Sequence, residues 1–195
     1  IAASSFGGMV YYTSPDRSAL LEQLQNKSIK EICDTDWKGL TIERLPEIPD
    51  FTLLVGWTGQ VAITASLIQA TEKKRKVATD SEFYKEFLKK SHAIVQGLQT
   101  AWNKQDIHAL QEGTRANRAL LNEFAKVMQL EIETPALQTL CDLAEQVGAC
   151  AKTSGAGGGD CGICFTQNET QRQQIETQWA KAQIQVLPLT IAEAW

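Results

Sequence analysis

The residues with the clearest chemical meaning form a glycine-rich segment in the last quarter of the sequence. It reads Lys152-Thr153-Ser154-Gly155-Ala156-Gly157-Gly158-Gly159-Asp160, and four of the five residues from 155 to 159 are glycine. Glycine loses more conformational freedom on folding than any other residue, so a fold keeps such a run where backbone must pass very close to something. Glycine loops also expose several backbone N–H groups in a concave array, which suits the oxygens of a phosphate group.

The segment differs from two familiar phosphate-binding loops. It does not end in Gly-Lys-Ser/Thr, as a Walker A loop does. It also joins two expected strands, whereas the dinucleotide fingerprint runs from a strand through the loop into a helix. On composition alone, a flexible hairpin tip is the alternative to a phosphate site.

The elements that must position this loop follow from hydrophobic patterning. Apolar runs, alternating or continuous, predict strands at residues 9–12, 40–45, 51–57, 149–153, 161–165 and 184–187. Helical spacing predicts helices at residues 17–25, 65–76, 134–148 and 169–181, and two more that begin after Asp80 or Ser81 and after Asp106. Because helices cluster and strands cluster along the chain, we predict an α+β fold, with a ferredoxin-like antiparallel sheet and a layer of helices on one face.

One predicted helix has a polar gap in its apolar stripe. Thr114 and Asn117 interrupt the apolar positions of the helix that follows Asp106. Core packing explains the flanking apolar residues but does not explain a polar pair in the centre of the stripe.

The five cysteines predict free thiols. Their number is odd and their spacing scattered, and a chain of 195 residues does not need disulfides to be stable, so we expect reduced thiols in a cytoplasm. Cys161 and Cys164 have the spacing of a redox or zinc motif. In a strand, however, residues three apart point to opposite faces, and no second cysteine pair accompanies them. We therefore expect no metal site.

The charge and the hydropathy of the sequence argue against further classes of protein. The net charge of −4 argues against a nucleic-acid scaffold, and the basic run at residues 73–76 is typical of a solvated helix face. We find neither a signal peptide nor an apolar run of the roughly 18–20 residues that a membrane helix needs. We therefore expect neither nucleic acid nor a membrane as a partner.

The glycine segment and its surroundings resemble the GHMP kinases, a superfamily of small-molecule kinases. The resemblance lies in Lys-x-Ser followed by Gly-Ala-Gly-Gly-Gly, and in the preceding segments 117–121, 135–137, 140–141 and 149–152. Within the superfamily, Gly56-Trp57-Thr58-Gly59 and Asp160-Cys161-Gly162-Ile163 are similar to the bacterial phosphomevalonate kinases. Residues 60–66 match that family only loosely.

The first residues extend the resemblance. Ala2-Ala3-Ser4-Ser5-Phe6-Gly7-Gly8 resembles the family segment that follows the catalytic aspartate, which would stand just before Ile1. The nucleotide loop of the family lies further upstream. The resemblance thus implies that residues 1–195 are the C-terminal domain of a longer kinase, with residues 1–16 a remnant of the N-terminal domain and residues 64–130 a cluster of helices.

The resemblance implies a reaction. ATP would donate its γ-phosphoryl group to 5-phosphomevalonate, giving 5-diphosphomevalonate and ADP in the mevalonate pathway of isoprenoid biosynthesis. Mg²⁺ and ATP would be bound mainly by the N-terminal half, which could pair with this chain. The alternatives are mevalonate kinase or another GHMP kinase, or a stable fragment that is inactive by itself.

The same resemblance implies roles for individual residues. The phosphate site would be lined by backbone N–H groups of Ser154, Gly155, Ala156, Gly157, Gly158 and Gly159. The substrate would be contacted by Thr58, Gly59, Asn117, Arg118 and Lys152. Three of these have plain alternatives: Lys152 as an exposed strand lysine, Arg118 in a surface salt bridge, and Thr58 as a turn hydroxyl that bonds its own backbone.

Overall fold

The computed structural model describes residues 2–60 and 81–192. The helix predicted at residues 65–76 and the capping role considered for Asp80 lie outside these residues. The chain divides into two compact units, Ile1–Glu47 with Ile191–Trp195, and Ile48–Thr190. The prediction that residues 1–16 belong to a different domain stays a prediction.

The first unit contains a two-stranded antiparallel sheet and short helices. Strand β1 (Val10–Thr13) pairs with β2 (Thr41–Arg44), and helix α1 (Ala2–Phe6) precedes them. Between the strands, α2 (Arg17–Asn26) begins where the Asp16 side chain accepts two backbone N–H groups, and α3 (Ile29–Cys33) begins with a capping box between Ser28 and Glu31. Both predicted strands and the predicted helix at residues 17–25 are confirmed.

The second unit contains the predicted antiparallel sheet. Its strands are β3 (Thr52–Trp57), β4 (Cys150–Thr153), β5 (Cys161–Thr166) and β6 (Gln185–Leu187), in the order β4-β5-β3-β6 with all neighbours antiparallel. Helices connect β3 to β4 and β5 to β6, so two strand-helix-strand units interleave. This arrangement confirms the ferredoxin-like α+β fold.

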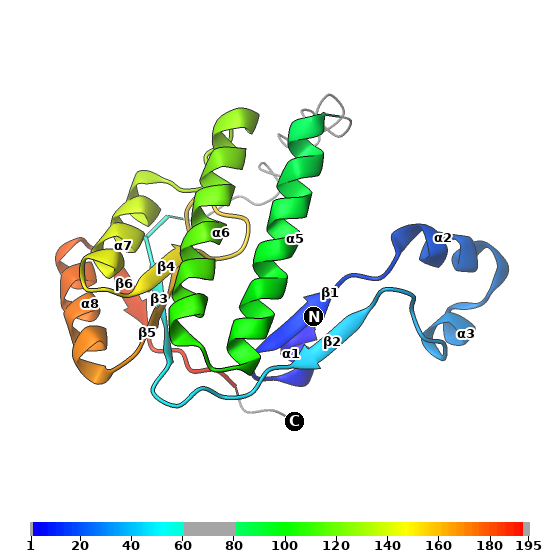
Figure 1. Cartoon of the computed structure of the whole chain (residues 1–195), viewed down its shortest axis with the longest axis horizontal. Helices are drawn as coiled ribbons and strands as arrows, with labels where there is room; N and C mark the ends of the chain where they lie inside the picture. The colour runs from blue at the N-terminus through cyan, green and yellow to red at the C-terminus, as the bar shows by residue number, and fades with distance from the viewer. Residues whose placement is uncertain (1, 61–80, 193–195) are drawn as a thin grey trace. The chain divides into compact units, whose positions relative to one another are not determined.

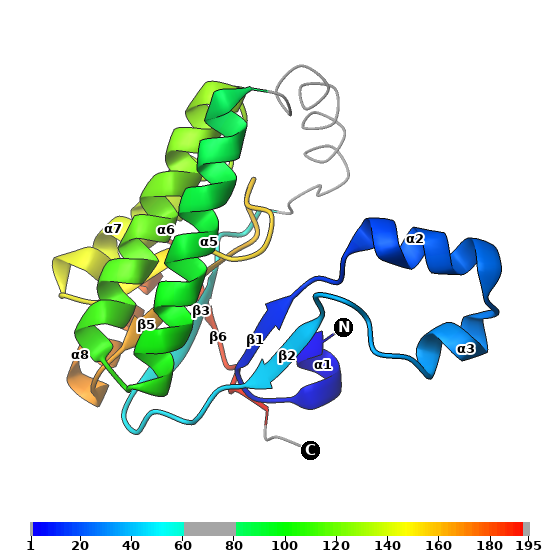
Figure 2. The same ribbon diagram turned by 45° about the vertical axis from the view of Figure 1, so that its right-hand side comes forward.

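Four helices of this unit begin at residues whose side chains cap them. They are α5 (Glu82–Asn103) after Ser81, α6 (Ile107–Met128) after Asp106, α7 (Pro135–Gln146) after Thr134, and α8 (Glu169–Lys181) after Asn168. Helices α5 and α6 run side by side as a long hairpin (Figures 1 and 2). Within the described residues, no helix is both long enough and apolar enough to cross a membrane.

The core lies between the sheet and helices α7 and α8. Gly56 and Gly162 are opposite each other on β3 and β5, and there the sheet has no side chain. A Cβ atom on Gly56 would lie 2.7 Å from the Trp179 ring, and one on Gly162 would lie 2.6 Å from Leu140. Trp179 also donates its indole N–H to the Leu140 carbonyl at 3.0 Å. The first glycine of Gly-Trp-Thr-Gly is therefore required by packing.

The opposite face of the sheet also meets a helix, which the sequence did not predict. Phe165 of β5 points away from the core that contains its neighbour Cys164. Its ring lies 4.9 Å from that of Phe51 and 5.9 Å from that of Trp102 in α5, centroid to centroid. The α5–α6 hairpin therefore adds contacts to the second face.

Candidate functional site

The glycine loop, residues 154–160, connects the neighbouring strands β4 and β5. Four of its glycines have positive φ angles, between 65° and 123°, and Asp160 follows with φ of 60°. Side chains other than Asn and Asp rarely adopt this left-handed region. The conformation therefore explains why glycine predominates here and why aspartate can end the run.

One side of the glycine loop is held by the loop that follows α6. Gly158 donates its N–H to the Ile132 carbonyl at 2.7 Å. At Gly157, with φ of 75°, a Cβ atom would overlap the backbone of Ile132 and approach its Cγ2 to 2.7 Å. The close approach expected at Gly157 is thus an approach to another part of the chain, and the loop is an anchored connection rather than a free hairpin tip.

Most of the remaining amides of the loop are unpaired within the described residues. The N–H of Ser154 donates to the Cys161 carbonyl at 2.9 Å, closing the hairpin. By contrast, the N–H groups of residues 155, 156, 157 and 159 have no acceptor among the described residues, and Gly157 and Gly159 are buried. A buried N–H without a partner costs about 1–3 kcal/mol. An anion at this position would remove that cost.

The Gly-Trp-Thr-Gly segment is bonded directly to the glycine loop. Thr58 donates both its N–H (2.9 Å) and its hydroxyl (3.0 Å) to the Asp160 carbonyl. Asp160 in turn donates its N–H to the Gln60 carbonyl at 2.8 Å. The Thr58 hydroxyl therefore bonds the glycine loop rather than its own backbone. The neighbouring Gly59, with φ of 77°, has open space where a Cβ would stand.

Lys152 is half-buried on β4, just before the loop, rather than exposed. Its ammonium donates to the Thr153 carbonyl at 2.7 Å, and no carboxylate of the described residues pairs with it. Burial lowers the pKa of this ammonium. A desolvated cation without a counter-charge is suited to an anionic ligand.

Arg118 lies on α6 and is engaged by two carboxylates. Its Nη2 lies 2.6 Å from Glu133 and 2.8 Å from Asp142, and its Nε also donates to Glu133 at 2.9 Å. These hydrogen bonds raise the pKa of the guanidinium. The geometry corresponds to the salt-bridge alternative, although most of this pair is buried, and a contact between Arg118 and substrate stays a prediction.

The polar gap of α6 is partly explained. Thr114 is buried and donates its hydroxyl to the Leu110 carbonyl at 2.8 Å, so its polar group is satisfied within its own helix. Asn117 is half-buried, and its side chain makes no hydrogen bond with the described residues. Asn117 therefore keeps the polar groups that a ligand contact would need.

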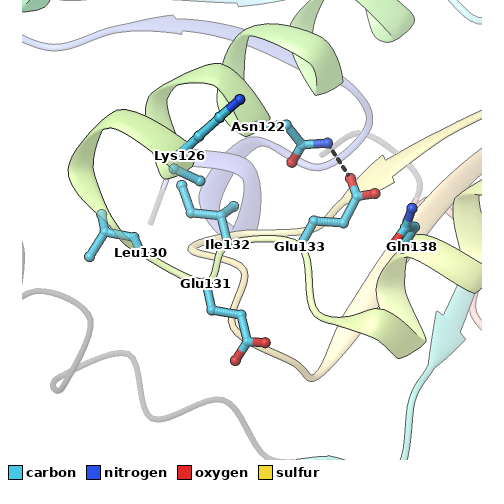
Figure 3. A pocket seen from close by; sticks show the side chains of 8 residues that line it. Asn122, Lys126, Leu130, Glu131, Ile132, Glu133 and Gln138 are labelled. Carbon is cyan, nitrogen blue, oxygen red and sulfur yellow. Dashed lines mark hydrogen bonds between the residues drawn. The ribbon is translucent and has the colours of Figure 1, made fainter.

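A cleft of about 330 Å³ opens beside the loop that follows α6 (Figure 3). None of the predicted site residues lines it. Its lining consists of Asn122, Ala125, Lys126, Leu130, Glu131, Ile132, Glu133 and Gln138. Sequence reasoning missed Ile132 and Glu133, because nothing in the spacing signals that they meet the glycine loop and Arg118.

The cysteines do not form a cluster with other ligand side chains. Cys141, Cys150 and Cys164 are buried, Cys161 is half-exposed and Cys33 is exposed, and all five are free thiols. Burial raises the pKa of Cys141 to about 12 and also raises that of Cys164. Within the described residues, no group of three or more His, Cys, Asp or Glu side chains could hold a metal ion.

Comparison with known proteins places this geometry in a family. Residues 95–185, which include the glycine loop, match the family described as GHMP kinases C terminal. This chain contains a GHMP kinase C-terminal domain. In that domain, the glycine loop, Lys152 and α6 belong to the matched segment, whereas Thr58 and Gly59 precede it.

Relatives of the whole chain were also found. A phosphomevalonate kinase of Streptomyces sp. (strain CL190) is 37% identical over 194 residues, which cover 98% of this chain and 51% of that protein. The Lin0012 protein of Listeria innocua superposes with a TM-score of 0.93 at 32% identity, over 100% of this chain and 54% of that one. A Streptococcus pneumoniae phosphomevalonate kinase, in complex with phosphomevalonate and AMPPNP, superposes with a TM-score of 0.78 at 26% identity, over 96% of this chain and 52% of that one. The chain that contains this GHMP kinase C-terminal domain thus spans about half the length of the relatives it matches.

Proposed function

We propose that this chain is the C-terminal portion of an ATP-dependent kinase that converts 5-phosphomevalonate to 5-diphosphomevalonate in the mevalonate pathway. The observation that carries the proposal is the glycine loop, whose amides at residues 155, 156, 157 and 159 lack acceptors among the described residues. The likeness to phosphomevalonate kinases over 98% of the chain supports this substrate class. Since the chain spans about half of those relatives, the activity is proposed for the whole protein.

The mechanism that we propose rests on alignment and charge neutralisation. The acceptor oxygen belongs to a phosphate that is already anionic, so no strong base is needed to remove a proton. The free amides of the glycine loop would donate to phosphate oxygens, and Lys152 would supply a positive charge that is already partly desolvated in the folded chain. These contacts favour the transition state when they tighten as charge moves between the phosphates.

Residues from two other elements complete the proposed site. Thr58 and Gly59 directly follow β3, and Thr58 is bonded to the glycine loop, so these two residues would close over the acceptor. Asn117 would reach the substrate from α6 with its unbonded side chain. For Arg118, whose guanidinium is engaged by Glu133 and Asp142, the contacts support a different role from substrate binding.

ATP and Mg²⁺ are part of the proposal. A relative whose structure contains AMPPNP supports use of ATP. The described residues offer no cluster of carboxylates that fits Mg²⁺, so that ion would be held mainly by the other half of the protein. The catalytic aspartate and the nucleotide loop that the resemblance implies would come from the other half of the protein. The free thiols support a cytoplasmic location as part of the same proposal.

An ADP-release assay on the full-length parent tests this proposal. The assay compares 5-phosphomevalonate with mevalonate as acceptor, and we expect turnover with the first alone. Preference for mevalonate or another alcohol would replace the proposed substrate by that of another GHMP kinase. Purified residues 1–195 are the second arm, for which we expect no turnover. Activity of this chain by itself would overturn the division of the machinery between two halves.

A further inference from the structure

The glycine loop rests on a segment that we call the support loop, residues 129–134 between α6 and α7. Ile132 is the point of contact. Its carbonyl accepts the N–H of Gly158 at 2.7 Å, and its backbone leaves no room for a side chain at Gly157. The position of Ile132 therefore sets the position of the middle of the glycine loop.

The support loop has few backbone hydrogen bonds of its own. Leu130 donates its N–H to the Ala125 carbonyl at the end of α6, and Thr134 caps the start of α7. Between these ends, the N–H groups of residues 131–133 have no acceptor among the described residues. Side-chain contacts must therefore fix the path of the backbone around Ile132.

Glu133 provides those contacts. Its carboxylate accepts the Nε and Nη2 of Arg118 at 2.9 and 2.6 Å, and the Nδ2 of Asn122 at 3.0 Å. Only 7% of this side chain is exposed, against 50% for Asp142, the other carboxylate that Arg118 contacts. Figure 3 shows Glu133 directed towards Asn122, with Ile132 beside it on the same loop. A buried, two-point guanidinium–carboxylate contact defines geometry as well as charge.

We propose that Glu133 is a positioning residue for the glycine loop and that Arg118 acts through it. Arg118 and Asn122, both on α6, fix the position of the Glu133 carboxylate. Glu133 in turn fixes the backbone of its neighbour Ile132. The Ile132 carbonyl then orients Gly158 so that the unpaired amides on either side face the ligand. The catalytic consequence of this chain of contacts rests on the proposed kinase function, whereas its effect on the loop does not.

A second ion pair of α6 provides a control for a purely structural role. Arg115 and Glu145 join α6 to α7, with Nε and Oε2 2.7 Å apart. That pair does not touch the support loop. If the contact between Arg118 and Glu133 served only as a general tie between α6 and the chain that follows it, breaking either pair would affect the glycine loop equally.

Amide hydrogen exchange followed by NMR tests the effect on the loop. Glu133→Gln replaces one acceptor oxygen with an NH₂ group that faces donors, so the support loop loses its anchor. We expect the Gly158 N–H to exchange at least about tenfold faster, and Glu145→Gln to leave it within about twofold. Equal acceleration in the two variants, or none in Glu133→Gln, would overturn the proposal.

Milder variants keep the test decisive if Glu133→Gln does not fold. Asn122→Ala removes one hydrogen bond from Glu133, and Arg118→Lys keeps the charge but loses the two-point contact. In either variant, we expect the Gly158 N–H to exchange faster by about threefold, with the Asp160 N–H as an internal reference. Unchanged exchange of Gly158 in both variants would equally overturn the proposal.

Kinetics of the full-length parent separate this inference from the proposed function. Misaligned phosphates should lower kcat by about tenfold in Glu133→Gln, with the acceptor KM within about twofold, while Glu145→Gln behaves as wild type. Faster exchange of the Gly158 N–H, together with a lower kcat and an unchanged KM in Glu133→Gln, supports both proposals. Faster exchange with unchanged kcat supports the positioning of the loop and overturns its assignment as the phosphate site.

Discussion

The carbonyl oxygen of Asp160 accepts two hydrogen bonds from Thr58, one from its N–H at 2.9 Å and one from its hydroxyl at 3.0 Å. These bonds join residues 102 positions apart in sequence. They connect the end of β3 to the end of the glycine loop, so neither segment can move without the other. Whatever ligand occupies this site meets both segments together.

Removing the Thr58 hydroxyl should weaken this connection. Thr58→Val keeps the shape and the N–H bond but loses the bond from the hydroxyl, so we expect the free energy of unfolding to fall by about 0.5–1 kcal/mol. Thr58→Ser keeps the hydroxyl and is the matched control. Urea unfolding of the two variants measures the difference. Equal stability of the valine and serine variants would show that the hydroxyl bond contributes nothing.

Two glycines of the loop should respond differently to alanine. At Gly157, the left-handed backbone and the overlap with Ile132 act together, so Gly157→Ala should lower the free energy of unfolding by roughly 3 kcal/mol or more. Gly155 has φ of 65° but open space around it, so Gly155→Ala should cost only about 1–2 kcal/mol. Thermal or urea unfolding of the pair checks this order, and an equal loss would contradict the packing against Ile132.

The same substitution at Gly155 should affect activity. Its added methyl group would stand beside amides that we assign to phosphate, so kcat/KM of the full-length parent should fall by about tenfold, a loss of 1.4 kcal/mol in transition-state binding. The assay is run at a temperature where the variant is fully folded. Full activity of Gly155→Ala would argue that phosphate lies elsewhere.

The half-buried ammonium of Lys152 should reduce the stability of the ligand-free chain. Burial lowers the pKa of Lys152 below the ordinary lysine value of 10.5. The unfolded chain therefore binds more protons than the folded chain between the folded pKa and 10.5, and stability rises with pH across that window. Below the folded pKa both states are protonated, and the desolvation cost is present in full. We therefore expect Lys152→Met to raise Tm by at least about 1 °C at pH 7.

The pH dependence provides the check on Lys152. The difference in Tm between Lys152→Met and wild type should narrow as pH rises towards 10.5. Lys89→Met, at an exposed position of α5, is the control for the added apolar surface and should show no such narrowing. A constant difference across this range would mean that the charge of Lys152 is well solvated.

Thiol reactivity should follow burial. In the folded chain without reductant, we expect a thiol reagent to modify Cys33 first and Cys161 more slowly, because Cys161 is half-exposed and its pKa is raised by burial and by Asp160. Cys141, Cys150 and Cys164 should stay protected until the chain unfolds. Denaturant should then reveal five thiols in all; three or one would mean that a disulfide had formed.

The sequence by itself determined most of the elements of this protein, although the short helices α1 and α3 were not predicted. The caps Ser81 and Asp106 and the apolar spacing that follows them were sufficient to predict α5 and α6, and α8 was predicted at the bounds it has. These signals are local, because a cap and a helical stripe depend on residues within a few positions of one another. The glycine motif was likewise visible as a backbone that must pass close to something.

What that backbone passes close to was decided only by the tertiary structure. Gly157 meets Ile132, Gly56 meets Trp179, and Arg118 meets Glu133, although 15 to more than 100 residues separate the members of these pairs. No spacing rule relates such partners, because their distance depends on the order of strands in the sheet and on the path of the loops between helices. The sequence therefore indicated a phosphate-binding loop, while the fold determined which of its glycines serve packing, which amides remain free, and which charged residues hold the loop in place.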